Sequence, residues 1–142
     1  MVRLLLLTLV FCFALAAPAA AKPSLADPAI ATKDFATIQE IAKGSTVNFY
    51  MYGGFAKTNQ WVDSYVAPAL KERYGITLKR VPMDAEVFMN KLFAEKAANK
   101  AEGSIDLLWI NGENFKNAVE AGLLFGPFAD KLPSFIEFVD PK

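Results

Sequence analysis

The chain has 142 residues, and its 15 basic and 15 acidic side chains give a formal net charge of zero at pH 7. This balance leaves no basic excess of the kind that binds nucleic acid or an anionic membrane surface. The sequence contains no histidine, a single cysteine, and none of the phosphate-loop, dinucleotide-binding or nucleophile-elbow motifs.

The first 21 residues have the three parts of a secretory signal peptide. Arg3 gives a basic start, the apolar run LLLLTLVFCFALAA follows, and Ala19–Ala21 forms an Ala-x-Ala cleavage site. The apolar run is too short for a membrane span, although an uncleaved anchor is the alternative. We expect cleavage after Ala21 and export to the periplasm. Cys12 would leave with this segment, and the chain has no histidine. The mature chain could therefore form no disulfide, no Ser-His or Cys-His nucleophile and no ordinary zinc site.

Residues 22–44 are expected to form a mature N-terminal segment that ends in a short helix. The part up to Lys33 is rich in alanine, proline and lysine, and it predicts a flexible start. Asp34 is a candidate N-cap for the helix, and Gly44 is a suitable C-terminal stop.

From residue 45 the pattern alternates between strands and helices. The expected elements are a strand at Thr46–Tyr52, a helix at Thr58–Tyr74, a strand at Ile76–Pro82, a helix from Asp84 to about Asn99, a strand at Ile105–Ile110 and a short helix at Glu113–Ala121. Pro68 predicts a kink or a restart in the first of these helices, and Gly75 is its expected end. After Gly122 the chain contains three prolines and predicts no clear helix.

The alternation predicts an α/β fold with a parallel sheet and helices on both faces. Right-handed connections allow either one-sided growth of the sheet or a reversal of strand order. In the reversed order, 2-1-3, the first strand lies between the other two. The loops after the first and third strands would then open on the same crevice, where open α/β sheets bind ligands.

The loop after the first strand is the first candidate for ligand binding. Gly53 and Gly54 either let the backbone approach a ligand or simply form a tight turn. Tyr52 and Phe55 flank the glycines, and aromatic side chains commonly line small-molecule sites, although a place in the core is the alternative.

The loop after the third strand, Asn111–Asn114, is the second candidate. Glu113 lies at a helix N-terminus, where the helix dipole stabilises the carboxylate form, so it does not suit general-base catalysis. The simpler interpretation is that Asn111 or Gly112 caps the helix; the functional one is that Asn111, Gly112, Glu113 and Asn114 line a ligand cleft. The sequence predicts no catalytic residue, no metal site and no cofactor.

Three stretches carry a family resemblance: GSTVNFYMYGG, YGITLKRVP and, most specifically, IDLLWINGENF. They resemble the extracellular solute-binding proteins of bacterial ABC importers, and among these the YnjB-like branch, from Asp34 to the C-terminus. The resemblance implies a periplasmic-binding-protein-like lobe of type II with the strand order 2-1-3, and contacts to a small solute from Gly53, Gly54 and Asn111–Asn114. Tyr52 stands where this branch leads us to expect tryptophan.

The resemblance also implies a larger protein with two lobes that close on the solute by a hinge motion and deliver it to an ABC permease in the inner membrane. Because such proteins are usually more than twice as long, we expect residues 45–142 to form part of lobe I, with the second lobe absent, in a monomer that is not an enzyme. Half a cleft should not bind its solute at micromolar concentration. The alternatives are an exported single-lobe protein-interaction module and a small secreted enzyme of flavodoxin-like architecture.

Overall fold

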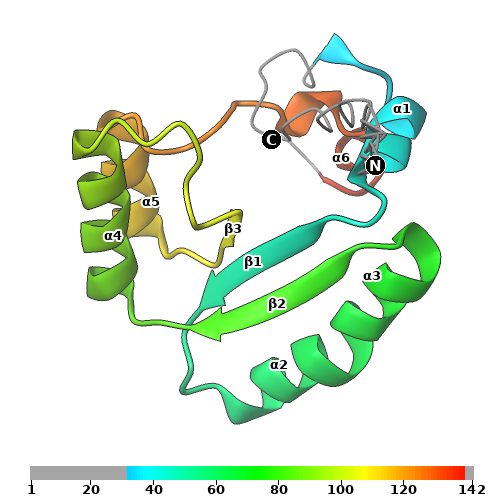
Figure 1. Cartoon of the computed structure of the whole chain (residues 1–142), viewed down its shortest axis with the longest axis horizontal. Helices are drawn as coiled ribbons and strands as arrows, with labels where there is room; N and C mark the ends of the chain where they lie inside the picture. Colours follow the sequence, from blue (N-terminus) through cyan, green and yellow to red (C-terminus); the bar gives the residue numbers. More distant parts are fainter. Residues whose placement is uncertain (1–31, 140–142) are drawn as a thin grey trace, which may run out of the picture.

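The computed structural model of the protein describes residues 32–139. The predicted signal peptide and the segment 22–31 lie outside the described residues. Three strands form one parallel sheet: β1 (Thr46–Met51), β2 (Thr77–Pro82) and β3 (Leu107–Leu108). Their order is β2-β1-β3 (Figure 1), which confirms the predicted reversal of strand order.

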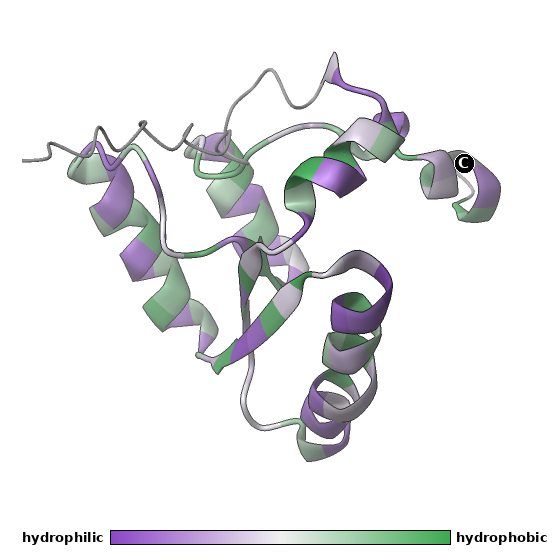
Figure 2. Cartoon of the chain, turned by 45° about the vertical axis from the view of Figure 1, so that its right-hand side comes forward, coloured by the Kyte–Doolittle hydropathy of each residue, from purple (hydrophilic) through white to green (hydrophobic). Residues whose placement is uncertain are grey.

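The helices surround this sheet on both faces, as predicted. They are α1 (Phe35–Ala42), α2 (Ala56–Trp61), η2 (Val62–Val66), α3 (Ala67–Tyr74), α4 (Ala85–Ala97), α5 (Gly112–Glu120), η3 (Ala129–Lys131) and α6 (Pro133–Phe138). Figure 1 shows α2 and α3 along β2, whereas α4 and α5 stand together on the other side of the sheet. Each of these helices carries both apolar and polar positions (Figure 2), as expected of a helix with one face against a sheet.

Alternate residues of β1 supply the two faces of the sheet with side chains. Phe49 and Met51 point to one face, where they form a buried cluster with Val62 of η2, and Leu78 of β2 packs against it. A second cluster lies between α4 and α5 and the sheet; its buried members are Phe88, Met89 and Ala118, and the partly buried Leu108 of β3 packs against them. The core therefore consists of two clusters, one between the sheet and η2 and the other between the sheet and the pair α4 and α5.

The helix ends follow the sequence signals closely. The Asp34 carboxylate accepts hydrogen bonds from the Thr37 N–H at 2.9 Å and the Thr37 hydroxyl at 2.6 Å, so the predicted N-cap of α1 is confirmed. Gly75 ends α3 with a φ of +68°, a left-handed conformation that favours glycine. The Gly44 N–H donates to the Gly75 carbonyl at 3.0 Å, which ties the two helix ends together beside the start of the sheet.

The expected kink at Pro68 takes the form of a π-helical turn. The chain stays helical from α2 through η2 to α3, and the Ala67 N–H bonds to the Val62 carbonyl five residues earlier. Proline has no N–H and its ring crowds the carbonyl four residues before it, here Ser64. The wider π-helical turn relieves this conflict without ending the helix.

The third strand is shorter than predicted, and one side chain explains part of the difference. The Asp106 carboxylate accepts hydrogen bonds from the backbone N–H of Asn48 at 2.7 Å and from its side-chain amide at 2.8 Å. The Asn48 N–H is therefore bonded to a side-chain carboxylate and not to a main-chain carbonyl of the strand segment just before β3. The regular ladder with β1 is confined to the pairs Phe49–Leu107 and Tyr50–Leu108.

The prediction that no helix follows Gly122 is wrong, because α6 forms at Pro133–Phe138. Pro133 occupies the first turn of this helix, where a fixed φ is favourable and the missing N–H has no intrahelical partner to lose. One of the three prolines after Gly122 therefore starts a helix.

Glu95 of α4 holds the turn that leads to β3. Its carboxylate accepts from the Ser104 hydroxyl at 2.6 Å and the Ser104 N–H at 3.0 Å. The ammonium groups of Lys100 and Lys91 lie 3.3 and 3.5 Å away. The Ser104 hydroxyl, the Ser104 N–H and Lys100 lower the pKa of Glu95 from 4.5 to about 2.

Replacing Met51 by alanine tests the core. Because Met51 is only 2% exposed, Met51→Ala should lower the free energy of unfolding by about 2–5 kcal/mol through lost burial and a cavity. Val87→Ala, at a position that is 52% exposed, should change it by less than about 0.5 kcal/mol. Urea unfolding measures both, and equal losses would contradict the described core.

The Glu95 hydrogen bonds predict a pH dependence of stability. Because the folded-state pKa is depressed, the carboxylate stabilises the fold above the unfolded pKa of about 4.5, and this contribution is lost as the pH falls from about 5 towards 2. Glu95→Gln should lower the free energy of unfolding at pH 7 by on the order of 1–2 kcal/mol and flatten its decline in acid. Glu120→Gln, at an exposed position, is the matched control. Identical pH profiles for the two variants would refute the role of Glu95.

Candidate functional site

The two predicted loops leave the same edge of the sheet. β1 runs parallel to β3, Tyr50 lies opposite Leu108, and the Trp109 N–H donates to the Tyr50 carbonyl at 2.9 Å. The first loop (Tyr52–Phe55) and the second loop (Asn111–Asn114) therefore follow the carboxyl ends of neighbouring strands. This is the position at which open α/β sheets bind ligands.

Two aromatic rings of the first loop form an exposed pair. The rings of Tyr52 and Phe55 meet edge to face, with centroids 5.2 Å apart and an interplanar angle of 78°. Their exposed fractions are 50% and 62%, so the alternative that places them in the core is wrong. This geometry stabilises an aromatic pair and leaves apolar surface open at the sheet edge.

The two glycines of the first loop allow close internal packing. A Cβ atom on Gly53 would lie 3.0 Å from the Cβ of Pro82 at the end of β2. A Cβ atom on Gly54 would overlap the ring and hydroxyl of Tyr52, which fold back over it. Both glycines are thus explained by neighbours within the chain, so the tight-turn interpretation accounts for their presence without a ligand.

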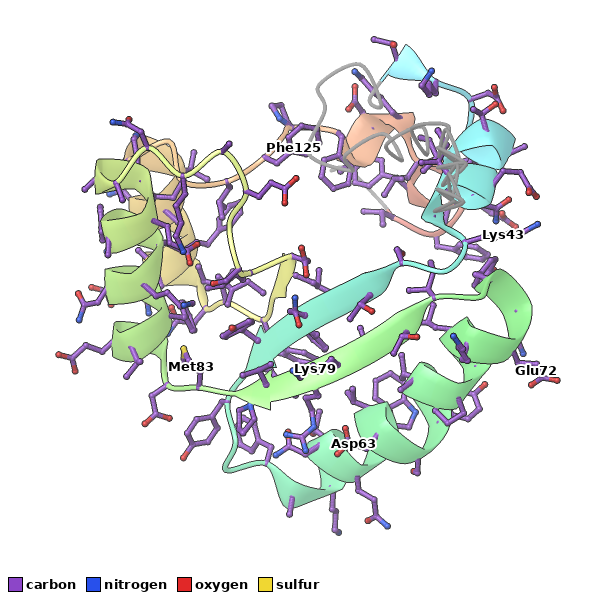
Figure 3. The ribbon with its side chains drawn as sticks, viewed as in Figure 1. Lys43, Asp63, Glu72, Lys79, Met83 and Phe125 are labelled. Atoms are coloured by element: carbon purple, nitrogen blue, oxygen red, sulfur yellow. The ribbon has the colours of Figure 1, made fainter. Side chains whose placement is uncertain are left out.

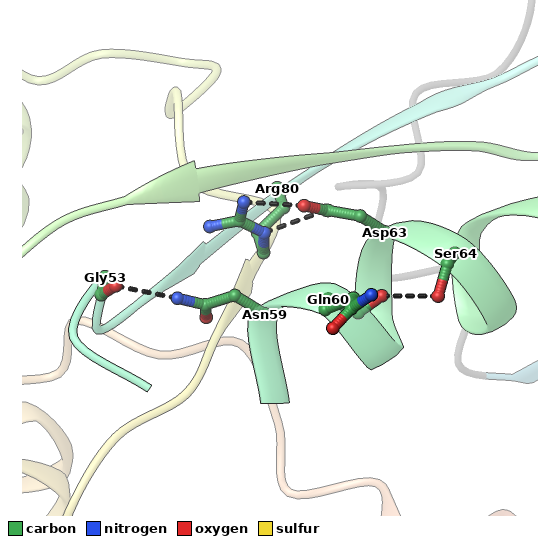
Figure 4. Close-up of polar contacts among 6 residues, drawn as sticks. All are labelled: Gly53, Asn59, Gln60, Asp63, Ser64 and Arg80. Carbon is green, nitrogen blue, oxygen red and sulfur yellow. Dashed lines mark hydrogen bonds and ion pairs between the residues drawn. The ribbon is translucent and has the colours of Figure 1, made fainter. Parts of the chain in front are cut away.

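Asn59 anchors the first loop from beneath, and the sequence analysis did not identify it. Its side-chain amide donates to the Gly53 carbonyl at 2.7 Å (Figure 4), and only 7% of the residue is exposed. The sequence does contain a signal for its burial. Asn59 lies three residues before the buried Val62 in a helical segment, and this spacing places both residues on the face that packs against the sheet. A polar residue at such a position requires a partner.

An ion pair connects the helix that follows the first loop to the outer strand of the sheet. The Arg80 guanidinium of β2 donates to both oxygens of Asp63 at 2.8 and 2.6 Å (Figure 4). This hydrogen bonding lowers the pKa of Asp63 and raises that of Arg80. Asp63 is therefore a structural carboxylate and is unsuited to donate a proton near neutral pH.

In the second loop, capping and exposure are divided between different residues. The Asn111 side-chain oxygen accepts from the Asn114 N–H at 3.0 Å, so the interpretation of Asn111 as the N-cap of α5 is confirmed. Glu113 lies exposed in the first turn of α5, and no atom lies within 4 Å of a Cβ built on Gly112. The side chain of Asn114 is partly buried and lines a shallow depression between α4 and α5.

The eight predicted residues follow one edge of the sheet in two separate groups. In residues 32–139, no hydrogen bond or ion pair joins the first loop to the second. Trp109, just before the second loop, stacks on Phe49 with centroids 6.5 Å apart and is 54% exposed. The edge therefore presents aromatic rings, two asparagine amides and one carboxylate on an open surface.

Within the described part of the chain, no group of three or more Asp, Glu, His or Cys residues could hold a metal ion. No helix among the same residues is long and apolar enough to cross a membrane.

The comparisons with known proteins give one match. The chain is similar to Protein YnjB of Escherichia coli (strain K12), with 40% identity over 121 residues, or 84% of this chain. The aligned part is 31% of YnjB, so the chain spans about a third of the length of that relative. No family model matches the chain, and no solved structure matches it.

Gly54→Ala should disrupt the exposed aromatic pair. The added methyl group would force the Tyr52 ring away from the backbone and from Phe55, while the exposed ring can move into solvent at a cost of less than about 1 kcal/mol in stability. The near-ultraviolet circular dichroism of tyrosine and the ring proton shifts of Phe55 should change. Gly112→Ala is the control, because its methyl group would enter open space. Unchanged Phe55 shifts in Gly54→Ala would contradict the described packing.

Proposed function

We propose that this chain provides part of one lobe of a solute-binding protein of a bacterial ABC importer. In this role it is exported to the periplasm by its signal peptide and holds a small solute at the carboxyl edge of its sheet. The solute then passes to a permease in the inner membrane. The observation that carries the proposal is the strand order, because it brings two exposed loops from distant parts of the sequence to one edge.

The residues at this edge suit binding of a small molecule without chemical change. Tyr52 and Phe55 offer an aromatic surface, and the carboxylate of Glu113 and the amide of Asn114 offer polar contacts. Ligand sites of this kind combine apolar surface with a few polar groups that fix orientation. We accordingly propose no enzymatic step and no cofactor at this site.

The likeness to YnjB supports the proposal in one further respect. Since the match covers a third of that protein, a complete inter-lobe cleft would require polypeptide beyond the matched part. One lobe supplies only part of the contacts and none of the hinge closure, so its own affinity for solute should be low.

Solute binding by the purified chain tests this proposal directly. With a library of sugars, amino acids, polyamines and vitamins at millimolar concentration, NMR should show fast-exchange shifts in both loops for one chemical class. The expected dissociation constant is about 1 mM or weaker, which corresponds to roughly −4 kcal/mol. Phe55→Ala should abolish the shifts, and the exposed Val87→Ala should preserve them.

Two results would overturn the proposal in different ways. If no solute class shifts either loop, the edge is not a solute site. If the chain alone binds a solute at micromolar concentration, the site is complete within this lobe and needs no second one.

A second function, an exported protein-interaction module, is favoured by a separate observation. Trp61 and Tyr65 stack at the surface of the helix that follows the first loop, with centroids 6.3 Å apart, and both are more than half exposed. Paired aromatic side chains of this type are frequent at protein interfaces. Retrieval of one partner protein that is lost in Trp61→Ala, with no response to any solute, would support this function instead.

A further inference from the structure

The segment after β2 reaches the same edge of the sheet as the two candidate loops. The Met83 N–H donates to the Met51 carbonyl at 2.9 Å, so the chain leaves β2 beside the point at which it leaves β1. Figure 3 shows Met83 where β2 leads into α4. Because β1 is the central strand, the first loop emerges between the segment that carries Asp84, after β2, and the segment that carries Glu113, after β3.

The carboxylates of Asp84 and Glu113 have no partner within residues 32–139. Asp84 is the N-cap residue of α4, a position at which aspartate normally accepts a capping hydrogen bond. Its side chain makes no such bond and no ion pair. Glu113 is exposed in the first turn of α5 and also lacks an ion pair. Both negative charges are therefore free to contact a ligand.

The charge of this edge is predominantly negative. The segments 52–55, 83–86 and 109–114 contain three acidic residues, Asp84, Glu86 and Glu113, and neither lysine nor arginine. Just beyond these segments, Lys116 pairs with Glu120 at 3.8 Å, and Lys57 in α2 has no ion pair with the described residues. The acidic excess favours a ligand with positive charge.

The groups that could hold an anion at this edge are occupied within the chain. A glycine pair before a helix can let backbone N–H groups approach an anion, but here the ring and hydroxyl of Tyr52 fill the space beside Gly54. The Asn114 N–H at the start of α5 is bonded to the Asn111 side chain, and Asp84 places a negative charge at the start of α4. An anionic solute would therefore meet filled or repulsive positions.

The aromatic rings of the first loop supply the second part of a cation site. Tyr52 and Phe55 are 50% and 62% exposed, and the face of an aromatic ring attracts a cation that lies within about 6 Å of its centroid. Neighbouring strands are about 4.8 Å apart, so β2 and β3 are separated by about 10 Å across β1. This spacing leaves room for one small cation between the two carboxylates.

We infer that the solute held at this edge is a small organic cation. Its ammonium or quaternary ammonium group contacts the rings of Tyr52 and Phe55 and lies between the carboxylates of Asp84 and Glu113. The inference rests on the proposed solute site and names the chemical class of its solute.

Solutes that differ in charge test the inference. The purified chain would be titrated in NMR experiments with choline, spermidine, glucose, inorganic phosphate and 3,3-dimethylbutan-1-ol, which is the neutral isostere of choline. At least one of the two cations should shift the resonances of both loops. That cation should bind at least fivefold more tightly than the neutral compounds or phosphate, because the rings and the carboxylates act on its charge.

Variants that remove charge but keep shape locate the cation. Asp84→Asn and Glu113→Gln should each weaken binding of the preferred cation about two- to fivefold. Phe55→Leu, which keeps an apolar side chain but removes the ring face, should weaken it by a similar factor. Glu72→Gln is the matched control and should leave binding unchanged, because Glu72 is exposed on α3 and lies far from Met83 (Figure 3). Circular dichroism would confirm that all four variants fold.

The results that would overturn the inference differ in what they mean for the proposed function. If a neutral or anionic compound shifts the two loops more strongly than any cation, the edge is a solute site but its solute is not a cation. If no compound of this panel or of the wider library shifts either loop, the solute site itself is refuted. Equal weakening by Glu72→Gln and the two site carboxylate variants would show that cations bind through the overall charge of the chain and not at this edge.

Discussion

The central position of β1 is the constraint on which the rest of the structure depends. Both neighbouring strands pair with it, and it supplies Phe49 and Met51 to the buried cluster beneath η2. Its carboxyl end leads directly into the first loop, and the Tyr50 carbonyl receives the N–H of Trp109 from the strand that leads into the second. Fold stability and the geometry of the candidate site therefore both depend on this strand, and a change in its register would move both loops at once.

Much of the fold could be predicted because local signals and long-range packing agree. The Asp34 cap, the left-handed Gly75 and the strands of β-branched and aromatic residues are all local features, and the structure contains each of them. The strand order could be narrowed to two arrangements by the handedness rule, and the resemblance to two-lobed proteins favoured the one observed. Agreement between local signals and long-range packing is typical of sequences that specify one fold.

The features that could not be predicted arise from side chains that act over long distances in the sequence. Asp106 bonds to Asn48, 58 residues earlier, and limits the regular part of β3. Lys96 of α4 donates to the Ala121 carbonyl at the end of α5 and so connects α4 to α5. No periodicity in the sequence encodes such contacts, since each depends on the fold that brings its partners together.

In the candidate site, the positions of the loops could be predicted from the sequence, but the roles of their individual residues could not. Sequence reasoning found both loops, because they follow strands in an alternating pattern. It could not tell whether Gly54 serves a ligand or a neighbouring ring, since either use leaves the same glycine in the sequence. In the structure the Tyr52 ring fills the space beside Gly54, and Asn111 caps α5. Phe55, which is 62% exposed despite its contact with Tyr52, and the exposed Glu113 therefore become the stronger candidates for ligand contact.

The shortness of β3 bears on the position of the second loop. The second loop begins only three residues after Leu108, and the described chain holds β3 in the sheet from one side, by two residue pairs with β1. Order in the second loop lowers the entropy that a solute must offset when it binds. In the proposed solute site, the pairing of β3 with β1 would therefore assist binding, because it fixes the strand from which the second loop starts.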